Sequence, residues 1–268
     1  MSDVDMASLR VMKPDAMAGR AAFVSGAGSG IGRAIAVRLV ELGMAVFGTG
    51  RRTEMLEGTA KLCEGQTGRF DFRPCNVRDT TAIEALVQEI GEAQGIDLLV
   101  NNAGGQFFAP ATEISRRGWD AVIDLNLSAV FTVTKAAYPF LKARRGAVAS
   151  ISLSGVDRGS MGLAHSIAAR AGVLGLTRSL ALEWAKDGIR LNCIAPGTVV
   201  TEGLAGEAAR PMLEKLTAAT PMGFTTSVEE VAELVAFLAS PAGRLMTGQL
   251  IQIDGAAHLG EGLHMIAA

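Results

Sequence analysis

Short apolar runs alternate with longer amphipathic stretches along the chain from residue 21 onward. Runs rich in Val, Ile and Leu predict strands, and stretches with apolar residues three or four apart predict helices. The predicted strands span residues 21–25, 45–49, 70–74, 98–101, 147–152, 190–194 and 249–253. The predicted helices span residues 30–42, 53–63, 79–93, 115–143, 163–186 and 227–238, with Asp79 as a cap and a break near Leu125.

Strands and helices that alternate in this way are typical of a parallel sheet covered by helices on both faces. The strands lack strict polar alternation, which also favours a sheet buried on both sides. Right-handed crossovers then give a doubly wound sheet. We therefore predict one α/β domain of the Rossmann type, with a doubly wound parallel sheet of about seven strands. The domain covers residues 19–268, and residues 1–18 form an N-terminal extension.

Residues 202–226 interrupt the alternation between the sixth strand and the following helix. The segment is rich in Ala, Gly, Thr and Pro, and a short helix is predicted near residues 208–216. Insertions at the carboxyl end of a parallel sheet often cover a ligand, so we expect a substrate lid. A surface excursion without a function is the alternative.

The composition describes a chain with a large core and little net charge. Of its 268 residues, 49% are hydrophobic, and the formal net charge is −2. Without a long basic run, a nucleic-acid partner is not expected. The three cysteines are far apart and there are three histidines, so neither a metal site nor a disulfide framework is expected. No early apolar run suits a signal peptide or a membrane span, so we expect a cytoplasmic protein with no membrane partner.

A glycine-rich turn follows the first predicted strand and opens the first predicted helix. Glycines at positions 26, 30 and 32 allow a tight turn, close approach of a pyrophosphate and close helix–strand packing. The positive end of the helix then faces the phosphates. The spacing G-x-x-x-G-x-G departs from the strict G-x-G-x-x-G, because position 33 is Arg. The expected cofactor contacts here are Gly26, Ser29, Gly30, Ile31 and Gly32.

The end of the second predicted strand indicates which dinucleotide is bound. An acidic residue there would bind the ribose hydroxyls and favour NAD(H). The chain instead has Arg51 and Arg52, whose guanidinium groups suit a 2′-phosphate. We therefore predict NADP(H), with Arg33 as a further phosphate contact; two solvated arginines at a helix start are the alternative.

Several motifs, in order and spacing, resemble the short-chain dehydrogenase/reductase family between Gly19 and Gly255. They are Gly26-x-x-x-Gly30-x-Gly32, Asn101-Asn102-Ala103-Gly104, Asn126 and Pro196-Gly197. The resemblance implies a seven-stranded Rossmann sheet, usually in a tetramer. It also implies that Asn76 and Val77 flank the adenine and that Asn102, Ala103 and Gly104 line the ribose side. The residues that it implies for the nicotinamide are Pro196, Gly197, Val199 and Thr201.

The resemblance also shows where this chain departs from the family's usual catalytic Asn, Ser, Tyr and Lys. Asn126 is kept, whereas Ser166 stands in the place of the Tyr and Arg170 in that of the Lys. Leu153 takes the place of the Ser, with serines on either side, and the single tyrosine, Tyr138, lies in the preceding helix. A serine hydroxyl has a far higher pKa than a phenol, and arginine does not give up its proton. Ordinary ketone reduction should therefore be badly impaired.

Further peptides resemble the peroxisomal trans-2-enoyl-CoA reductases and, more distantly, the 2,4-dienoyl-CoA reductases. They are Gly104-Gly105-Gln106-Phe107, Gly118-Trp119, Glu183-Trp184-Ala185 and the stretch from His165 to Gly172. The resemblance implies NADPH-dependent reduction of the C2=C3 double bond of an enoyl thioester, with an acyl-CoA thioester as substrate. The catalytic candidates are Asn126, Ser166, Arg170 and His165, with no metal.

Other interpretations remain open for the site and for the protein. His165 and Ser166 are alternatively a cap or packing at a helix start, and Arg170 a ribose ligand. Gln106 and Phe107 are either substrate contacts or loop packing. The protein is alternatively a dehydrogenase of a specialised alcohol, enal or ketone, or a non-catalytic subunit of a mixed oligomer. Predicted helices 115–143 and 163–186 are apolar on more than one face, which favours a homotetramer.

Overall fold

The computed structural model of the chain describes residues 10–201 and 210–260. Seven parallel strands form one sheet in the order β3-β2-β1-β4-β5-β6-β7. The strands are β1 (Ala21–Ser25), β2 (Ala45–Gly50), β3 (Arg69–Pro74), β4 (Leu98–Asn101), β5 (Ala147–Ile151), β6 (Arg190–Pro196) and β7 (Leu250–Ile253). The predicted doubly wound α/β sheet is confirmed, because the strand order reverses at β1 and β4.

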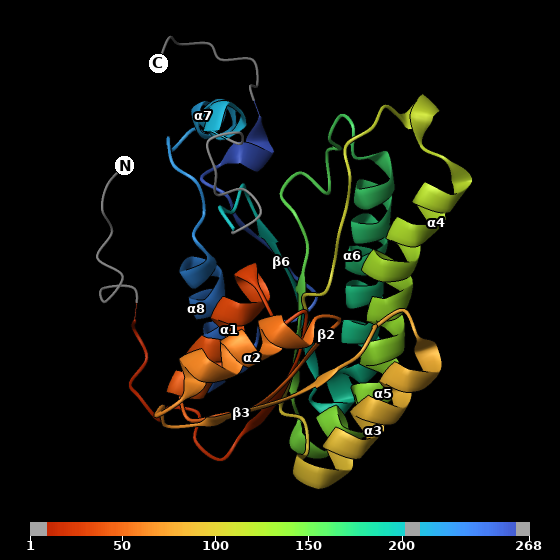
Figure 1. The fold of residues 1–268 in the computed structure, drawn as a ribbon. Coiled ribbons are helices and arrows are strands. Elements are labelled where there is room, and N and C mark those ends of the chain that lie inside the picture. Colours follow the sequence, from red (N-terminus) through yellow and green to blue (C-terminus); the bar gives the residue numbers. More distant parts are fainter. Residues whose placement is uncertain (1–9, 202–209, 261–268) are drawn as a thin grey trace.

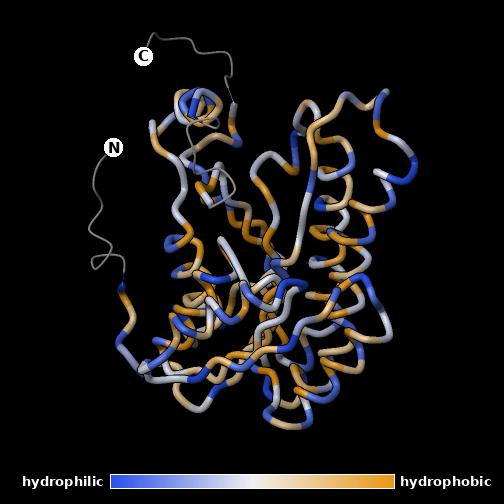
Figure 2. Tube along the Cα trace, in the orientation of Figure 1, coloured by the Kyte–Doolittle hydropathy of each residue, from blue (hydrophilic) through white to orange (hydrophobic). Residues whose placement is uncertain are grey.

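Helices cover both faces of the sheet, as Figure 1 shows. The α-helices are α1 (Gly30–Glu41), α2 (Thr53–Cys63), α3 (Thr80–Gln94), α4 (Arg116–Ile123), α5 (Ala129–Arg144), α6 (Ala164–Trp184), α7 (Arg210–Ala218) and α8 (Val228–Ala239). One buried cluster joins the sheet to α1, α2 and α8, and a second joins it to α3, α5 and α6. In Figure 2 the flanking helices carry both hydrophobic and hydrophilic positions, so each buries one side and exposes the other.

The predicted long helix of residues 115–143 is divided into α4 and α5 by a π-helical turn, Asp124–Ser128. The predicted break near Leu125 falls within this turn. A π-helical turn inserts an extra residue into the helix and is frequent at functional sites. Asn126 lies in it and is buried, so the break turns this amide inward from the helix.

The ends of several elements differ slightly from the prediction. β6 continues to Pro196 because its pairing with β7 extends to Pro196 and Ile253. Asp79 caps α3 by accepting a hydrogen bond from the backbone of Ala82, as predicted. Of the predicted lid, residues 202–209 lie outside the described residues, and the predicted short helix appears as α7. None of the helices in the described part of the chain is long and apolar enough to cross a membrane.

Candidate active site

The glycine-rich turn lies at the carboxyl end of β1 and is held by the end of β4. Asn102 Nδ2 donates hydrogen bonds to the carbonyls of Ser25 at 3.1 Å and Gly26 at 3.2 Å. A Cβ at Gly32 would lie 2.2 Å from the Gly26 carbonyl oxygen and 2.3 Å from Asn102 Nδ2, so glycine is required there. The absence of a side chain at Gly32 therefore allows α1 to pack closely against the ends of β1 and β4. The backbone of Gly26, with φ of 69°, is also one that glycine favours.

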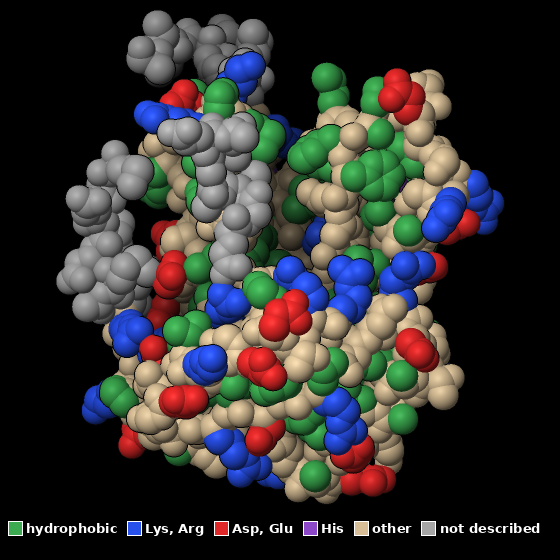
Figure 3. All heavy atoms as spheres, in the orientation of Figure 1, with side chains coloured by type: hydrophobic (Ala, Val, Ile, Leu, Met, Phe, Trp, Pro, Cys, Tyr) green, Lys and Arg blue, Asp and Glu red, His purple; other side chains and the backbone are tan. Residues whose placement is uncertain are grey.

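A cavity of about 680 Å³ opens above this turn. Its lining includes most of the predicted cofactor contacts, namely Gly26, Ser29, Gly30, Ile31, Arg51, Arg52, Asn76, Val77, Asn102, Ala103, Gly104 and Thr201. Figure 3 shows Lys and Arg side chains gathered along one edge of the hollow on this face. The glycine backbone at one end of the cavity fits a pyrophosphate. The arginines at the other end fit a phosphorylated ribose.

Arg33, predicted as a further phosphate contact, also binds groups of the protein itself. Its guanidinium Nη2 donates to the Gly28 carbonyl at 2.6 Å, and its Nε donates to Thr59 Oγ1 at 3.3 Å. Thr59 Oγ1 in turn donates to the Ala27 carbonyl at 2.9 Å. Arg33 thus binds the carbonyl side of the glycine-rich turn and joins it to α2.

Three of the predicted nicotinamide contacts lie at the end of β6, beside the cavity lining. The Pro196 carbonyl accepts from the Ser154 backbone N–H, and the Gly197 N–H donates to the Ile253 carbonyl. Val199 pairs with Thr226. Thr201 is the member of this group that lines the cavity within the described residues. Pro196, Gly197 and Val199 thus make backbone contacts at the end of β6.

Asn126 holds the loop that follows β4. The Gly105 N–H donates to Asn126 Oδ1 at 3.0 Å, and Asn126 Nδ2 donates to the Gly105 carbonyl at 2.8 Å. Two hydrogen bonds to one residue fix both the position and the orientation of its peptide groups. The π-helical turn thus fixes the backbone next to Gly104, which lines the nucleotide cavity.

Ser166 and Arg170 lie one turn apart on α6 and point to the same loop and to β5. Ser166 Oγ donates to Gln106 Oε1 at 2.6 Å and accepts from Arg170 Nε at 3.4 Å. Arg170 Nη1 donates to the Ile151 carbonyl at 2.9 Å. Burial lowers the pKa of Arg170 to about 10, so the guanidinium remains charged near neutral pH.

His165 is fully buried at the start of α6 and packs edge-on against Phe107, with 4.3 Å between ring centres. Neither ring nitrogen has a hydrogen-bond partner within the described residues. The predicted catalytic residues Asn126, Ser166 and His165 are thus brought together around the loop 105–107. Gln106, which the sequence left between two interpretations, is exposed, and so is Phe107.

The chain's single tyrosine lies elsewhere. The Tyr138 hydroxyl donates to Asp187 Oδ2 at 2.8 Å, and its ring lies 4.8 Å from that of Trp184. Lys142 also pairs with Asp187 at 3.0 Å. Tyr138 is therefore part of a contact between the ends of α5 and α6 and supplies no phenol to the site.

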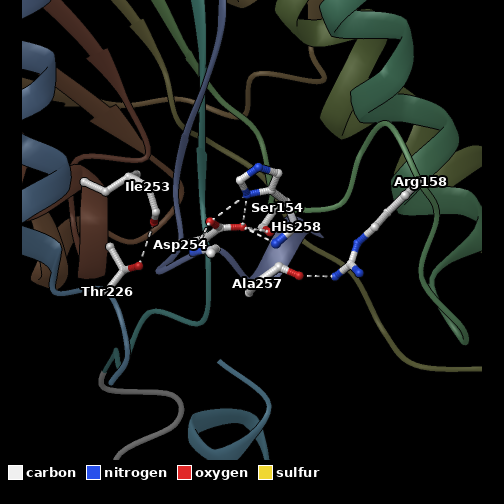
Figure 4. A network of polar contacts seen from close by, with 8 residues as sticks. Ser154, Arg158, Thr226, Ile253, Asp254, Ala257 and His258 are labelled. Carbon is white, nitrogen blue, oxygen red and sulfur yellow. Dashed lines mark hydrogen bonds and ion pairs between the residues drawn. The ribbon is translucent and has the colours of Figure 1, made fainter. Parts of the chain in front are cut away.

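A further polar network, shown in Figure 4, joins the end of β7 to the loop after β5. The Ser154 hydroxyl donates to Asp254 Oδ2, and His258 Nδ1 lies 2.9 Å from Asp254 Oδ1. Burial would raise the pKa of Asp254, but the hydrogen bonds from Ser154 and His258 outweigh it and hold that pKa below its usual range. The sequence analysis missed Asp254 and His258; their spacing of four residues after the last strand was the available signal.

Metal ligation is not supported by the arrangement of side chains in the described residues, where no three His, Cys, Asp or Glu side chains cluster as ligands. Ser166, Arg170 and Gln106 form a chain of hydrogen bonds beside the loop that follows β4. Such groups donate hydrogen bonds but do not titrate near neutral pH.

Comparisons with known proteins identify the family. A family profile described as "Enoyl-(Acyl carrier protein) reductase" matches residues 26–258. The 3-oxoacyl-(acyl-carrier-protein) reductase FabG of Thermotoga maritima is 36% identical over 242 residues, which cover 88% of this chain and 97% of that protein. A Bacillus subtilis protein named "Probable 2,4-dienoyl-CoA reductase" is 36% identical over 243 residues, covering 88% of this chain and 95% of its own.

Solved structures agree with this assignment. A variant of the actinorhodin polyketide ketoreductase, determined with NADPH, has a TM-score of 0.84 and 34% sequence identity. The match covers 89% of this chain and 97% of that one. The chain belongs to the short-chain dehydrogenase/reductase family and is an oxidoreductase of that family. The family predicted from the sequence motifs is thereby confirmed.

Proposed function

We propose that the protein reduces the C2=C3 double bond of an enoyl thioester with NADPH. One observation carries the proposal: the site contains hydrogen-bond donors but no phenol, because Tyr138 is bonded to Asp187. Reduction of a ketone requires a proton on the carbonyl oxygen, which the usual tyrosine donates. Reduction of a conjugated double bond requires that the carbonyl oxygen be stabilised as it gains charge and that the α-carbon, rather than this oxygen, take up a proton.

The cofactor of the reaction is NADP(H). The glycine-rich turn is suited to its pyrophosphate, and Arg51 and Arg52 to its 2′-phosphate. Asn76 and Val77 are assigned to the adenine, and Asn102, Ala103 and Gly104 to the ribose side. We assign Pro196, Gly197, Val199 and Thr201 to the nicotinamide.

NADPH, when bound, supplies the hydride that adds to the β-carbon of the thioester. Electrons of the double bond then move toward the thioester oxygen, where the loop 105–107 and the charged Arg170 favour negative charge. The α-carbon takes up a proton from water or from a hydroxyl group.

The substrate class is supported by two different relatives. One is named a reductase of 3-oxoacyl groups on acyl carrier protein, and the other a dienoyl-CoA reductase. Both names describe acyl chains held as thioesters. We propose an acyl-CoA thioester for this chain, because its loop motif Gly104 to Phe107 resembles that of the trans-2-enoyl-CoA reductases.

The assembly that we propose is a homotetramer in the cytoplasm. Apolar side chains on α5 and α6 support it, because Phe131 is 47% exposed and Leu182 is 82% exposed in the single chain. We also propose residues 202–226 as a lid, supported by α7 and by the contact of Thr220 and Met222 with Gly255 at the end of the sheet. Residues 1–18 remain a proposed N-terminal extension.

The test uses the purified chain alone with NADPH deuterated at the transferred position. We expect oxidation of NADPH with a trans-2-enoyl-CoA, deuterium at the β-carbon and solvent hydrogen at the α-carbon of the product. Reduction of an enal or ketone by NADPH, or oxidation of an alcohol by NADP⁺, with no turnover of the enoyl-CoA would contradict the proposal. NADPH binding without turnover of any of these compounds would indicate a non-catalytic subunit.

A further inference from the structure

The loop 105–107 is attached residue by residue to the predicted catalytic side chains. Gly105 is bonded twice to Asn126, Gln106 accepts the hydroxyl of Ser166, and Phe107 packs on His165. Three side chains from the π-helical turn and from α6 thus hold three consecutive residues. Their common effect is to fix the conformation of this loop.

Burial separates the holding side chains from the group that a substrate can reach. Ser166 and His165 are 0% exposed and Asn126 is 4% exposed. Gln106, in contrast, belongs to the exposed residues of the loop. A hydrogen bond to an entering substrate is therefore available from the amide of Gln106 rather than from the three buried side chains.

The hydrogen-bond direction determines which end of this amide faces the substrate. Ser166 uses its only hydrogen on Gln106 Oε1, at 2.6 Å, so it has none left for a second acceptor. The amide oxygen is thereby occupied, and the amino group of Gln106 carries the two remaining donor hydrogens. The chain of bonds from the Arg170 cation through Ser166 withdraws electron density from the amide and strengthens these donors.

The loop that carries Gln106 begins at the wall of the nucleotide cavity. Gly104 lines that cavity and precedes Gln106 by two residues. A Cβ built at Gly104 would lie 3.2 Å from Arg170 Nη2 and 3.1 Å from Asn126 Oδ1. Gly104 of the cavity wall therefore lies close to the Arg170 guanidinium and to Asn126, which holds the loop. This contact lies at the carboxyl end of β4.

We propose that Gln106 is a catalytic residue whose side-chain amino group donates a hydrogen bond to the carbonyl oxygen of the substrate. Ser166 and Arg170 are positioning residues that act through Gln106. The substrate is a carbonyl compound in which the hydride is added either to the carbonyl carbon or to a double bond conjugated with it. Its identity as an enoyl thioester rests on the function proposed above. No proton leaves Gln106; the amide lowers the energy of the negatively charged oxygen.

The kinetic test is a double-mutant cycle with Gln106→Ala, Ser166→Ala and the double variant. We expect Gln106→Ala to lower kcat about 10²–10³-fold, the usual effect of removing one such donor, with little change in the Kd for NADPH. Ser166→Ala should lower kcat less than Gln106→Ala does. The double variant should have the same kcat as Gln106→Ala alone. Gln88→Ala, an exposed glutamine on α3, is the matched control and should retain full activity.

If Ser166→Ala lowers kcat equally with and without Gln106, the serine acts on the substrate by itself and the inference is overturned. The cycle is measured with whichever carbonyl compound the wild type reduces. An enzyme that reduces ketones only would therefore contradict the proposed function and would still test Gln106.

A spectroscopic readout tests the same contact without turnover. Infrared spectra of a saturated acyl-CoA labelled with carbon-13 at the carbonyl report hydrogen bonds to that oxygen. We expect the carbonyl band to move to lower frequency on binding to the wild type with NADP⁺ and to return toward its solution value in Gln106→Ala. A band that is the same in both proteins, or no binding to the wild type, would overturn the inference.

Discussion

Asn126, Ser166 and His165 each contact a different residue of the loop 105–107. The buried amide of Asn126 forms hydrogen bonds with both the N–H and the carbonyl of Gly105, so neither backbone group is left unpaired. Asn126 therefore acts mainly by fixing the position of the loop. Ser166 is also fully buried, and it fixes the position of the loop through its hydrogen bond to Gln106. At the scale of the residue, the site is therefore the loop 105–107, whose conformation is fixed by buried side chains.

Replacement of Asn126 tests this support. Asn126→Ala removes both hydrogen bonds to Gly105 and should lower the free energy of unfolding by about 1–3 kcal/mol. It should also lower kcat, because the loop is then less well fixed. Urea unfolding followed by circular dichroism, together with steady-state kinetics, measures both effects. An unchanged unfolding free energy with full activity would argue against a supporting role.

The Asp254 network predicts a pH dependence of stability. Because the pKa of Asp254 is lower in the folded state, its charge stabilises the fold above the usual aspartate pKa of about 3.9, and this contribution is lost as the pH falls through the folded value. Asp254→Asn should cost about 1–3 kcal/mol at pH 7 and progressively less below pH 4. Unfolding free energies of both proteins from pH 7 to pH 3 provide the test, and a constant difference would contradict it.

The residue types of the site could be predicted from the sequence, but their contacts could not. The resemblance to the family's catalytic set predicted that Asn126, Ser166 and Arg170 lie in one site, and the glycine-rich turn predicted where the nucleotide binds. Which side chain faces solvent depends on the conformation of the loop after β4. That conformation is set by the π-helical turn and by α6, far away in the sequence. The Asp254 network also joins residues about a hundred positions apart.

The strands and helices followed the hydrophobic pattern closely where the strands are buried between two layers of helices, as in β1, β4, β5 and β6. Buried strands such as β1 and β4 end where apolar runs end, and their predicted bounds match. Pattern alone could not predict the π-helical form of the break after α4, since a wide turn and a kink leave the same hydrophobic spacing. The extension of β6 to Pro196 likewise depends on pairing with β7.

At the scale of the element, we propose that the junction of β2 and α2 determines the choice of nucleotide. Replacing both Arg51 and Arg52 by Ala should raise the Kd for NADPH about 10–100-fold and change that for NADH little, because only NADPH has a phosphate there. Arg69→Ala, an arginine at the start of β3, is the control and should affect neither. Titration calorimetry measures all three, and an equal loss of both nucleotides would contradict the assignment.

The whole molecule exposes apolar side chains on the faces of α5 and α6 that point away from the sheet. Exposed apolar area of this kind is typical of contacts between subunits. Sedimentation velocity should give a tetramer for the wild type, and Leu182→Glu should shift it to smaller species. A wild type that sediments as a monomer would contradict the proposed assembly.

The proposed function depends on a site that donates hydrogen bonds without a phenolic proton. The most direct measurement compares the rates at which the chain oxidises NADPH with a trans-2-enoyl-CoA and with the 3-oxoacyl-CoA of the same acyl length. Our account predicts a kcat/KM for the enoyl-CoA that is higher by about two orders of magnitude or more, since general acid catalysis contributes about 10²–10⁴-fold to the ketone reaction. A higher kcat/KM for the 3-oxoacyl-CoA would contradict it.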